Sequence, residues 1–183
     1  TTPFYSEGGG QVGDIGLIEN SSERITIVDV KKENKLIVHF TDTLPNDIAA
    51  SFVAKVNADK RKSSARNHTA THLLQESLRN VLGKHVAQKG SLVNPSYLRF
   101  DFTHFSKIEK SDLQKIEADV NAKILANIVL NEYTDLLLSK AEELGAVMLF
   151  GEKYEDVVRM IQFDTSKELC GGTHVSATGE IGL

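Results

Sequence analysis

The strongest constraint on this chain is a pair of ligand-type motifs that lie far apart in its sequence. His68 and His72 are four residues apart in a segment with helical periodicity, so their imidazoles should project from the same helix face, one turn apart. Cys170 and His174 have the same spacing, in a segment that contains two adjacent glycines. Three imidazoles and a thiolate form a nitrogen-and-sulfur donor set that favours zinc. We therefore expect a fold that brings His68, His72, Cys170 and His174 together around a zinc ion.

The chemistry of such a site is less constrained than its composition. A histidine pair alone is more often accidental, but the second motif, with the only cysteine of the chain, favours a metal site. Thr69 occupies the position of the glutamate in H-E-x-x-H peptidases, so that class of enzyme is disfavoured. Four protein ligands are typical of structural zinc, whereas catalytic zinc usually keeps one position for water, so both roles stay open. Because the two motifs are distant in sequence, metal binding should be linked to folding of this region.

The composition indicates a folded chain from a reducing compartment. Its 183 residues, 40% of them hydrophobic, suffice for one ordinary domain or two small ones. No apolar run approaches the roughly 20 residues of a membrane span, and no signal-peptide pattern is present. A single cysteine cannot form an intrachain disulfide. We therefore expect a cytoplasmic protein without membrane contact. The lack of an initiator methionine predicts a segment of a longer protein.

The charge pattern gives little support to nucleic-acid binding by itself. The formal net charge is −4, whereas a basic surplus is the usual signature of such proteins. A local basic cluster exists, and it reads equally well as a solvated connection before a helix; its members are Lys60, Arg61, Lys62 and Arg66.

The first sixty residues are predicted to be rich in β-strands. Ile25–Val30 and Lys35–Phe40 are β-branched runs around a polar turn, which is typical of a hairpin, and residues 11–18 and 48–56 are further candidate strands. Several short strands in this space favour a small barrel-like subdomain. We expect a β-rich unit over residues 1–60 and an α+β core over residues 61–183.

A glycine-rich segment, Glu7–Asp14, interrupts this first unit. Gly8, Gly10 and Gly13 formally match G-x-G-x-x-G, but a dinucleotide fingerprint needs a strand before it and a helix after it, and neither is expected here. The simpler interpretation is a tight turn that requires positive φ. The functional alternative is a backbone that a ligand can approach closely. The triplet Gly9-Gly10-Gln11 also resembles the tripeptide of peptide-release factors, but no other part of the chain does.

The remaining chain alternates helices and strands without a regular period, which favours the α+β class. Residues 57–66 read as a connection, residues 67–82 as a helix that ends at Gly83, and residues 111–127 as a second helix. Ser111 with Gln114, and Ser139 with Glu142, match capping boxes, the latter for a short helix that ends at Gly145. The expected strands are 85–92, 98–102, 128–138, 146–150 and 157–163.

Several motifs together resemble a known family. They are His68–Leu74, Gln88–Val93, Leu98–Phe102, Phe150–Tyr154 and Cys170–His174, with Pro3–Tyr5 and Gly9–Asp14 near the N-terminus. In combination they resemble the editing domain of alanyl-tRNA synthetase over essentially the whole chain. The resemblance implies hydrolysis of serine or glycine wrongly esterified to tRNA(Ala), a zinc cofactor, and the acceptor end of tRNA as the partner. ATP and magnesium would belong to the aminoacylation domain of that family, which we expect to lie outside this sequence.

The resemblance also implies residue roles. The zinc ligands fall on His68, His72, Cys170 and His174, and the catalytic pocket residues on Thr71 and Gln88. Thr71 would read the serine hydroxyl, and Gln88 would hold the ester carbonyl or the attacking water. The plainer alternatives are a Thr71 hydroxyl bonded to a carbonyl one turn back and a Gln88 exposed on a strand. Candidate contacts to substrate or tRNA are Gly9, Gly10, Gln11, Arg66, Lys89 and Arg99.

Other functional interpretations stay open. The related editing domain of threonyl-tRNA synthetase also acts on serine esters, and a free-standing serine-editing protein is another form of the same activity. A different class is a zinc-stabilised tRNA-binding module without catalysis. No aspartate or glutamate lies within the two ligand motifs, so the sequence offers no obvious general base.

Overall fold

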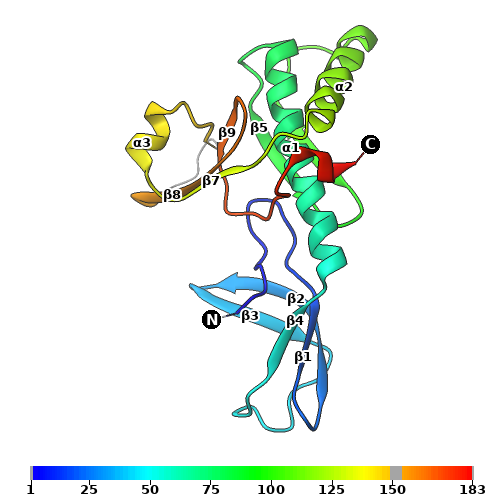
Figure 1. Ribbon diagram of the computed structural model, residues 1–183, viewed down its shortest axis with the longest axis vertical. Helices are drawn as coiled ribbons and strands as arrows, with labels where there is room; N and C mark the ends of the chain where they lie inside the picture. The colour runs from blue at the N-terminus through cyan, green and yellow to red at the C-terminus, as the bar shows by residue number, and fades with distance from the viewer. Residues whose placement is uncertain (1, 149–153, 183) are drawn as a thin grey trace.

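The structure, a computed structural model, describes residues 2–148 and 154–182 and has the predicted α+β class. Figure 1 shows a sheet at one end, a long helix that runs away from it, and a second sheet beside that helix. In chain order the elements are β1 (Gly16–Glu19), β2 (Arg24–Glu33), β3 (Leu36–Thr41), β4 (Val53–Val56), α1 (Ala58–Leu82), β5 (Gln88–Val93), β6 (Leu98–Phe102), α2 (Lys110–Leu125), β7 (Asn131–Leu137), α3 (Leu138–Glu143), β8 (Val157–Phe163), β9 (Ser166–Leu169) and the 3-10 helix η1 (Thr178–Ile181).

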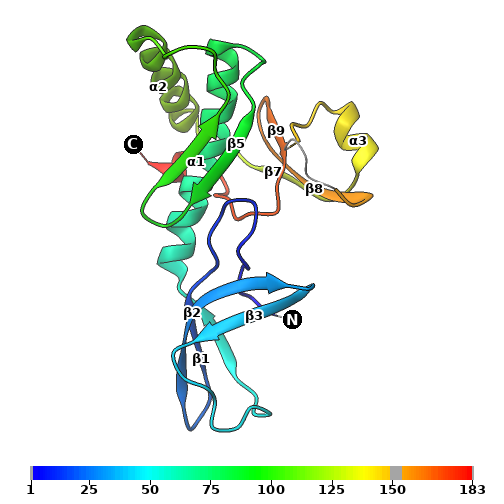
Figure 2. The same cartoon turned by 180° about the vertical axis from the view of Figure 1, so that it is seen from behind.

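The N-terminal sheet is antiparallel with strand order β3-β2-β1-β4. It contains the predicted hairpin, now β2 and β3, in which Val30 lies opposite His39. The barrel-like expectation was wrong, because within the described residues this sheet is open. Among the described residues its edge strands β3 and β4 do not pair with each other; of residues 11–18 only Gly16–Ile18 lie in β1, and of residues 48–56 only β4 is a strand. The chain before β1 instead leaves the sheet and extends toward α1, as Figure 2 shows from behind.

Helix α1 is the element on which α2, β5, β6, β9 and η1 pack. It begins at Ala58, nine residues earlier than predicted, and the side chain of Asn57 caps it by accepting a hydrogen bond from the backbone N–H of Lys60 at 3.1 Å. The residues interpreted as a connection are its first turns. Apolar periodicity missed them because the buried residues there, Ser64 and Ala65, are small or polar. The helix ends at Gly83, as predicted. The φ of Gly83 is 115°, so its backbone is not in the left-handed helical conformation that was expected.

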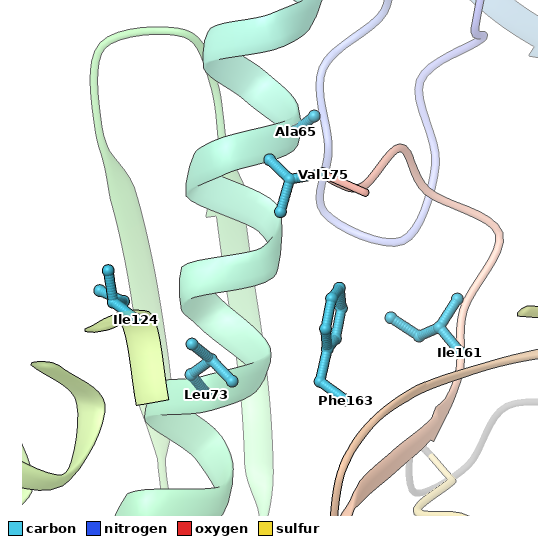
Figure 3. Close-up of a cluster of buried hydrophobic side chains, with 6 residues drawn as sticks. All are labelled: Ala65, Leu73, Ile124, Ile161, Phe163 and Val175. Atoms are coloured by element: carbon cyan, nitrogen blue, oxygen red, sulfur yellow. The ribbon is translucent and has the colours of Figure 1, made fainter. Parts of the chain in front are cut away.

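The main hydrophobic cluster joins α1 to the C-terminal half of the chain. Figure 3 shows its six buried side chains, which come from α1, α2, β8 and the segment after β9; they are Ala65, Leu73, Ile124, Ile161, Phe163 and Val175. Strands β7, β8 and β9 form an antiparallel sheet in that order. Strand β9 was not predicted, and it is only four residues long. Because Val175 is held in this cluster, the loop that contains Cys170 and His174 lies against α1.

Several local predictions differ from the structure. Neither capping box forms: α2 begins at Lys110 after Glu109, α3 begins after Leu137, and neither cap residue makes a side-chain hydrogen bond. Of the strand expected over 146–150, residues 146–148 form only an isolated bridge between Val147 and Glu168, and residues 149–150 lie outside the described residues. The strand expected over 85–92 is β5, shifted by one to three residues, and 98–102 is β6. No helix in the described ranges is long and apolar enough to cross a membrane.

Candidate metal centre and adjoining pocket

The structure brings the four predicted ligands together. His68 and His72 lie on α1, and Cys170 and His174 lie on the loop between β9 and η1. One nitrogen of each histidine and the Sγ of Cys170 all lie within 4.8 Å of one another. Sγ is 3.2 Å from Nε2 of His174 and 3.5 Å from Nε2 of His68. This arrangement of three imidazoles and a thiol can hold a metal ion, and its chemistry fits zinc.

A second layer of residues holds the Nδ1 atom of each imidazole. Nδ1 of His68 is 2.7 Å from Oε1 of Gln11, Nδ1 of His174 is 3.1 Å from Oγ1 of Thr69, and Nδ1 of His72 is 2.8 Å from Oε2 of Glu168. The first two are hydrogen bonds, whereas the third is a close ion-pair contact that is not aligned as a hydrogen bond. Outer partners of this kind fix the orientation of metal-binding histidines and leave Nε2 available to the metal.

The charges of the cluster favour a thiolate. Burial opposes ionisation of Cys170, but the contacts from His174, His68 and His72 hold its pKa well below the usual value. Burial also disfavours the charged form of His72, yet the Glu168 carboxylate raises its pKa to about 10. Burial lowers the pKa of His174 to about 3, so this ring is neutral. Without a metal, these contacts favour a Cys170 thiolate beside a protonated His72, and a metal ion would replace the proton of His72.

The two glycines of the loop differ in what surrounds them. A Cβ at Gly172 would lie 2.1 Å from Cε1 and 2.3 Å from Nδ1 of His68, so only glycine lets the loop pass this close to the helix. A Cβ at Gly171 would meet nothing within 4 Å. Arg159 on β8 holds the loop by donating from Nη1 to the carbonyl oxygens of Cys170 at 2.7 Å and Gly172 at 2.8 Å. The path of the loop is thus set by close packing on one side and an arginine on the other.

A pocket of about 460 Å³ opens beside the cluster. Its walls come from α1, β5, β8, β9 and the glycine-rich segment, and they include three of the four ligands, His68, His72 and Cys170. Both predicted catalytic residues, Thr71 and Gln88, line it as well. A cavity of this size is in the range of small-molecule sites.

The two predicted catalytic side chains are already partly engaged. The hydroxyl of Thr71 donates to the carbonyl oxygen of Asn67 at 2.8 Å, which is the back-bonded arrangement weighed from the sequence. Its oxygen keeps a lone pair for a further donor. Nε2 of Gln88 lies 3.3 Å from Oγ of Ser91, a long contact that leaves Oε1 uncommitted among the hydrogen bonds described.

The other predicted contacts divide between the pocket and elsewhere. Gly9 lines the pocket, whereas Gly10 packs against Ser91 and Gln11 is only 1% exposed. Arg66 donates from Nε to the carbonyl oxygen of Glu180, and Arg99 pairs with Asp101 on the exposed side of β6. Lys89 is an exposed residue of β5. None of the three cations is among the described residues that line this pocket.

Sequence reasoning missed the residues that hold the ligands. Glu168 lies two residues before Cys170, and Thr69 directly follows His68. Their polar character within or next to the ligand motifs was the available signal, but only the structure shows which nitrogen each of them meets. Arg159, a charged residue in a mostly apolar strand, was a similar signal.

Comparisons with known proteins agree with the motifs. The model of the family described as "tRNA synthetases class II (A)" matches residues 1–62, and that of the "Threonyl and Alanyl tRNA synthetase second additional domain" matches residues 158–183. An alanine–tRNA ligase of Bacteroides fragilis is 57% identical over 182 residues, which is 100% of this chain and 21% of that protein. Those of Flavobacterium psychrophilum and Porphyromonas gingivalis are 54% and 50% identical, over 98% and 99% of this chain and again 21% of each relative. The chain thus spans about a fifth of the length of these relatives.

Proposed function

The chain belongs to the alanine–tRNA ligase family, and from this premise we propose that it is the editing portion, which hydrolyses serine or glycine esters of tRNA(Ala). The observation that carries the proposal is the shared pocket, because three of the four zinc-type ligands line the same cavity as Thr71 and Gln88. Attachment of alanine to tRNA would belong to other parts of the longer protein. The division into residues 1–60 and 61–183 is part of the same proposal.

Editing is needed because of a limit on selection by size. A pocket that accepts alanine cannot exclude the smaller glycine, and it rejects a side chain with one added hydroxyl only weakly. A second, hydrolytic site solves this problem when it recognises the hydroxyl with a hydrogen-bonding partner. The lining of this pocket contains such a partner in Thr71.

We assign Thr71 the recognition of serine, with a defined direction. Because its proton is given to the carbonyl oxygen of Asn67, the Thr71 oxygen can only accept. The serine hydroxyl would therefore donate to Oγ1 of Thr71. Alanine offers no donor there, so its ester would be held less well. Glycine also lacks a hydroxyl, so this assignment covers serine alone.

We assign Gln88 the position of the reacting ester. Its carboxamide offers both a donor and an acceptor, and it lies on β5 across the cavity that Thr71 and the ligands line. It would hold the ester carbonyl or the attacking water. Zinc at the His68, His72, Cys170 and His174 donors would supply Lewis-acid polarisation.

The acceptor end of tRNA is the partner that this activity requires. We propose that the terminal nucleotide enters beside Gly9, where the absence of a side chain leaves the backbone accessible. Lys89 and Arg99, on the neighbouring strands β5 and β6, are candidates for phosphate contacts, which position RNA without reading its sequence. Arg66, whose guanidinium donates to Glu180, is a weaker candidate. We propose the cytoplasm, because a reducing compartment keeps the single cysteine available as a thiolate ligand.

The experiment compares hydrolysis of Ser-tRNA(Ala) and Ala-tRNA(Ala) by this chain, with zinc content measured on the same sample. We expect faster release of serine from zinc-loaded protein. Thr71→Val should reduce the preference for serine over alanine, and Thr71→Ser, which keeps the acceptor oxygen, should largely retain it. Thr71→Val with both rates unchanged would refute the role of Thr71. If the zinc-loaded chain bound tRNA and left both esters intact while the longer ligase hydrolysed them, that result would assign catalysis to the whole protein. If neither the chain nor the longer ligase hydrolysed the esters, a binding module would be favoured.

A further inference from the structure

We propose that Gln11 is a positioning residue of the metal centre and that it couples metal binding to the packing of the glycine-rich segment on α1. This inference rests on metal binding, which is part of the proposed function, and not on ester hydrolysis. The sequence placed Gln11 among candidate contacts to tRNA or substrate. Its side chain is instead 1% exposed and lies between the two halves of the ligand set.

A tight turn brings Gln11 to the ligands. Gly8 and Gln11 exchange backbone hydrogen bonds of 3.1 and 3.0 Å, and the two residues between them, Gly9 and Gly10, have φ values of +56° and +82°. Positive φ at both central positions is the requirement of a type I′ turn, and glycine meets it without strain. The turn is anchored to β5 at Val93, which donates to Gly10 O at 2.8 Å and accepts from the N–H of Val12 at 3.0 Å. The glycines are thus used to place one buried side chain.

The amide of Gln11 bonds to both ligand motifs at once. Oε1 accepts from the backbone N–H of Thr173 at 3.0 Å and lies 2.7 Å from Nδ1 of His68. Nε2 donates to Oγ1 of Thr173 at 2.9 Å. His68 belongs to the helical motif and Thr173 to the loop motif, so a single side chain from the first dozen residues links ligand pairs that are 102 residues apart.

These contacts determine the tautomer of His68. A backbone N–H is always a donor, so the amide atom that meets Thr173 N must be the oxygen and not the nitrogen. Nδ1 of His68 meets the same oxygen and must therefore carry the proton. The lone pair is then on Nε2, the atom that faces Sγ of Cys170. Gln11 thus holds His68 in the form and orientation that bind a metal.

The coupling must act in both directions. If the turn at Gly8–Gln11 stabilises the arrangement that binds metal, then bound metal stabilises the turn by the same free energy. Gln11 lies in the part of the chain that matches class II synthetases, and Thr173 lies in the part that matches the second additional domain. The hydrogen bonds of Gln11 therefore connect two segments that belong to different family models.

The test uses the 183-residue chain and three variants. Zinc affinity is measured by competition with a chromophoric chelator. Gln11→Leu removes the acceptor and should weaken zinc binding roughly 10–100-fold, as loss of an outer partner of a ligand typically does. Gln11→Glu restores an acceptor for His68 and Thr173 and should bind within a few-fold of the original chain. The matched control is Ser77→Ala on α1, the helix that carries His68. The buried hydroxyl of Ser77 donates to Asp119, so this variant should lose stability without losing zinc affinity.

Hydrogen exchange of residues 8–13, with and without zinc, is the second measurement. We expect slower exchange with zinc in the original chain, with the N–H of Val12 as a reporter, and a much smaller effect of zinc in Gln11→Leu. Unchanged affinity in Gln11→Leu, affinity in Gln11→Glu as weak as in Gln11→Leu, or exchange in the original chain that zinc does not alter would each overturn the proposal. If Gln11→Leu does not fold, exchange in the original chain alone decides. Absence of zinc binding by the original chain would instead refute the metal site of the proposed function.

Discussion

Replacing Gly172 by alanine should abolish tight metal binding while leaving most of the fold intact. The added Cβ would lie 2.1 Å from Cε1 of His68, 2.3 Å from its Nδ1 and 3.0 Å from Oε1 of Gln11. Carbon atoms in contact are separated by roughly 3.5–4.0 Å, so ring and loop would have to separate by about 1.4 Å or more. The distance between a metal ion and each ligand atom can deviate from its ideal value by only about 0.2 Å. His68 would therefore be lost as a ligand, together with its contact to Gln11.

The size of the effect follows from two separate terms. Forcing a group into a packed site costs about 1–3 kcal/mol of folding free energy. Loss of an outer partner of a ligand lowers metal affinity roughly 10–100-fold, or about 1.4–2.7 kcal/mol of binding free energy. Loss of the ligand His68 itself should lower the affinity by more than this. Gly171→Ala is the matched control, because its Cβ meets nothing within 4 Å. We expect it to change either quantity by less than about 0.5 kcal/mol.

Two measurements separate these terms. Competition with a chelator gives the zinc affinity of the original chain, Gly172→Ala and Gly171→Ala, and urea unfolding in the presence of a chelator gives the stability of the metal-free proteins. The reasoning would be refuted if Gly172→Ala bound zinc as tightly as the original chain. It would also fail if Gly171→Ala were impaired to the same extent, since the defect would then come from the backbone and not from the approach to His68.

Three further predictions concern the thiol and the core. Cys170→Ala should lose zinc, and full metal occupancy in that variant would remove Cys170 from the ligand set. In metal-free protein at pH 7, Cys170 should absorb at 240 nm as a thiolate, because its pKa is held well below the usual value. The Cys170→Ser variant gives the baseline absorbance. An absorbance that rises only near pH 8.5 would contradict this prediction. Leu73→Ala should destabilise the fold by about 2–5 kcal/mol in chemical unfolding, whereas the exposed Leu44→Ala should stay within about 0.5 kcal/mol, and equal effects would refute the position of Leu73 in the core.

The sequence was most informative where residue type and spacing determine the chemistry. The two pairs of ligand-type residues could be found because three histidines and the only cysteine of the chain together form a donor set suited to zinc, although the histidine pair alone would not have sufficed. The hairpin of β2 and β3 and the strand β6 followed from alternation and turn residues. These features depend on neighbours in the chain, and local pattern reasoning captures them.

The missed features depend on contacts between distant residues. The start of α1 was missed because Ser64 and Ala65 are buried without being strongly apolar, and their burial reflects close packing. The capping boxes failed because a sequence match does not require the serine to adopt the cap conformation. Gln11 was predicted from the sequence only as a contact to substrate or tRNA, because its burial against His68 requires the path of a turn anchored at Val93. Its partner Thr173 is 162 residues away.

The separation of the ligands along the chain also has a consequence in time. His68 and Cys170 are 102 residues apart, and chains are synthesised at roughly 5–20 residues per second. Helix α1 therefore leaves the ribosome about 5–20 s before the loop that completes its donor set. During this interval the hydrogen-bonding partners that the loop gives to Gln11 do not yet exist. The candidate metal centre is thus among the last parts of this region to assemble, and its full donor set would be available to an ion only after synthesis of the loop.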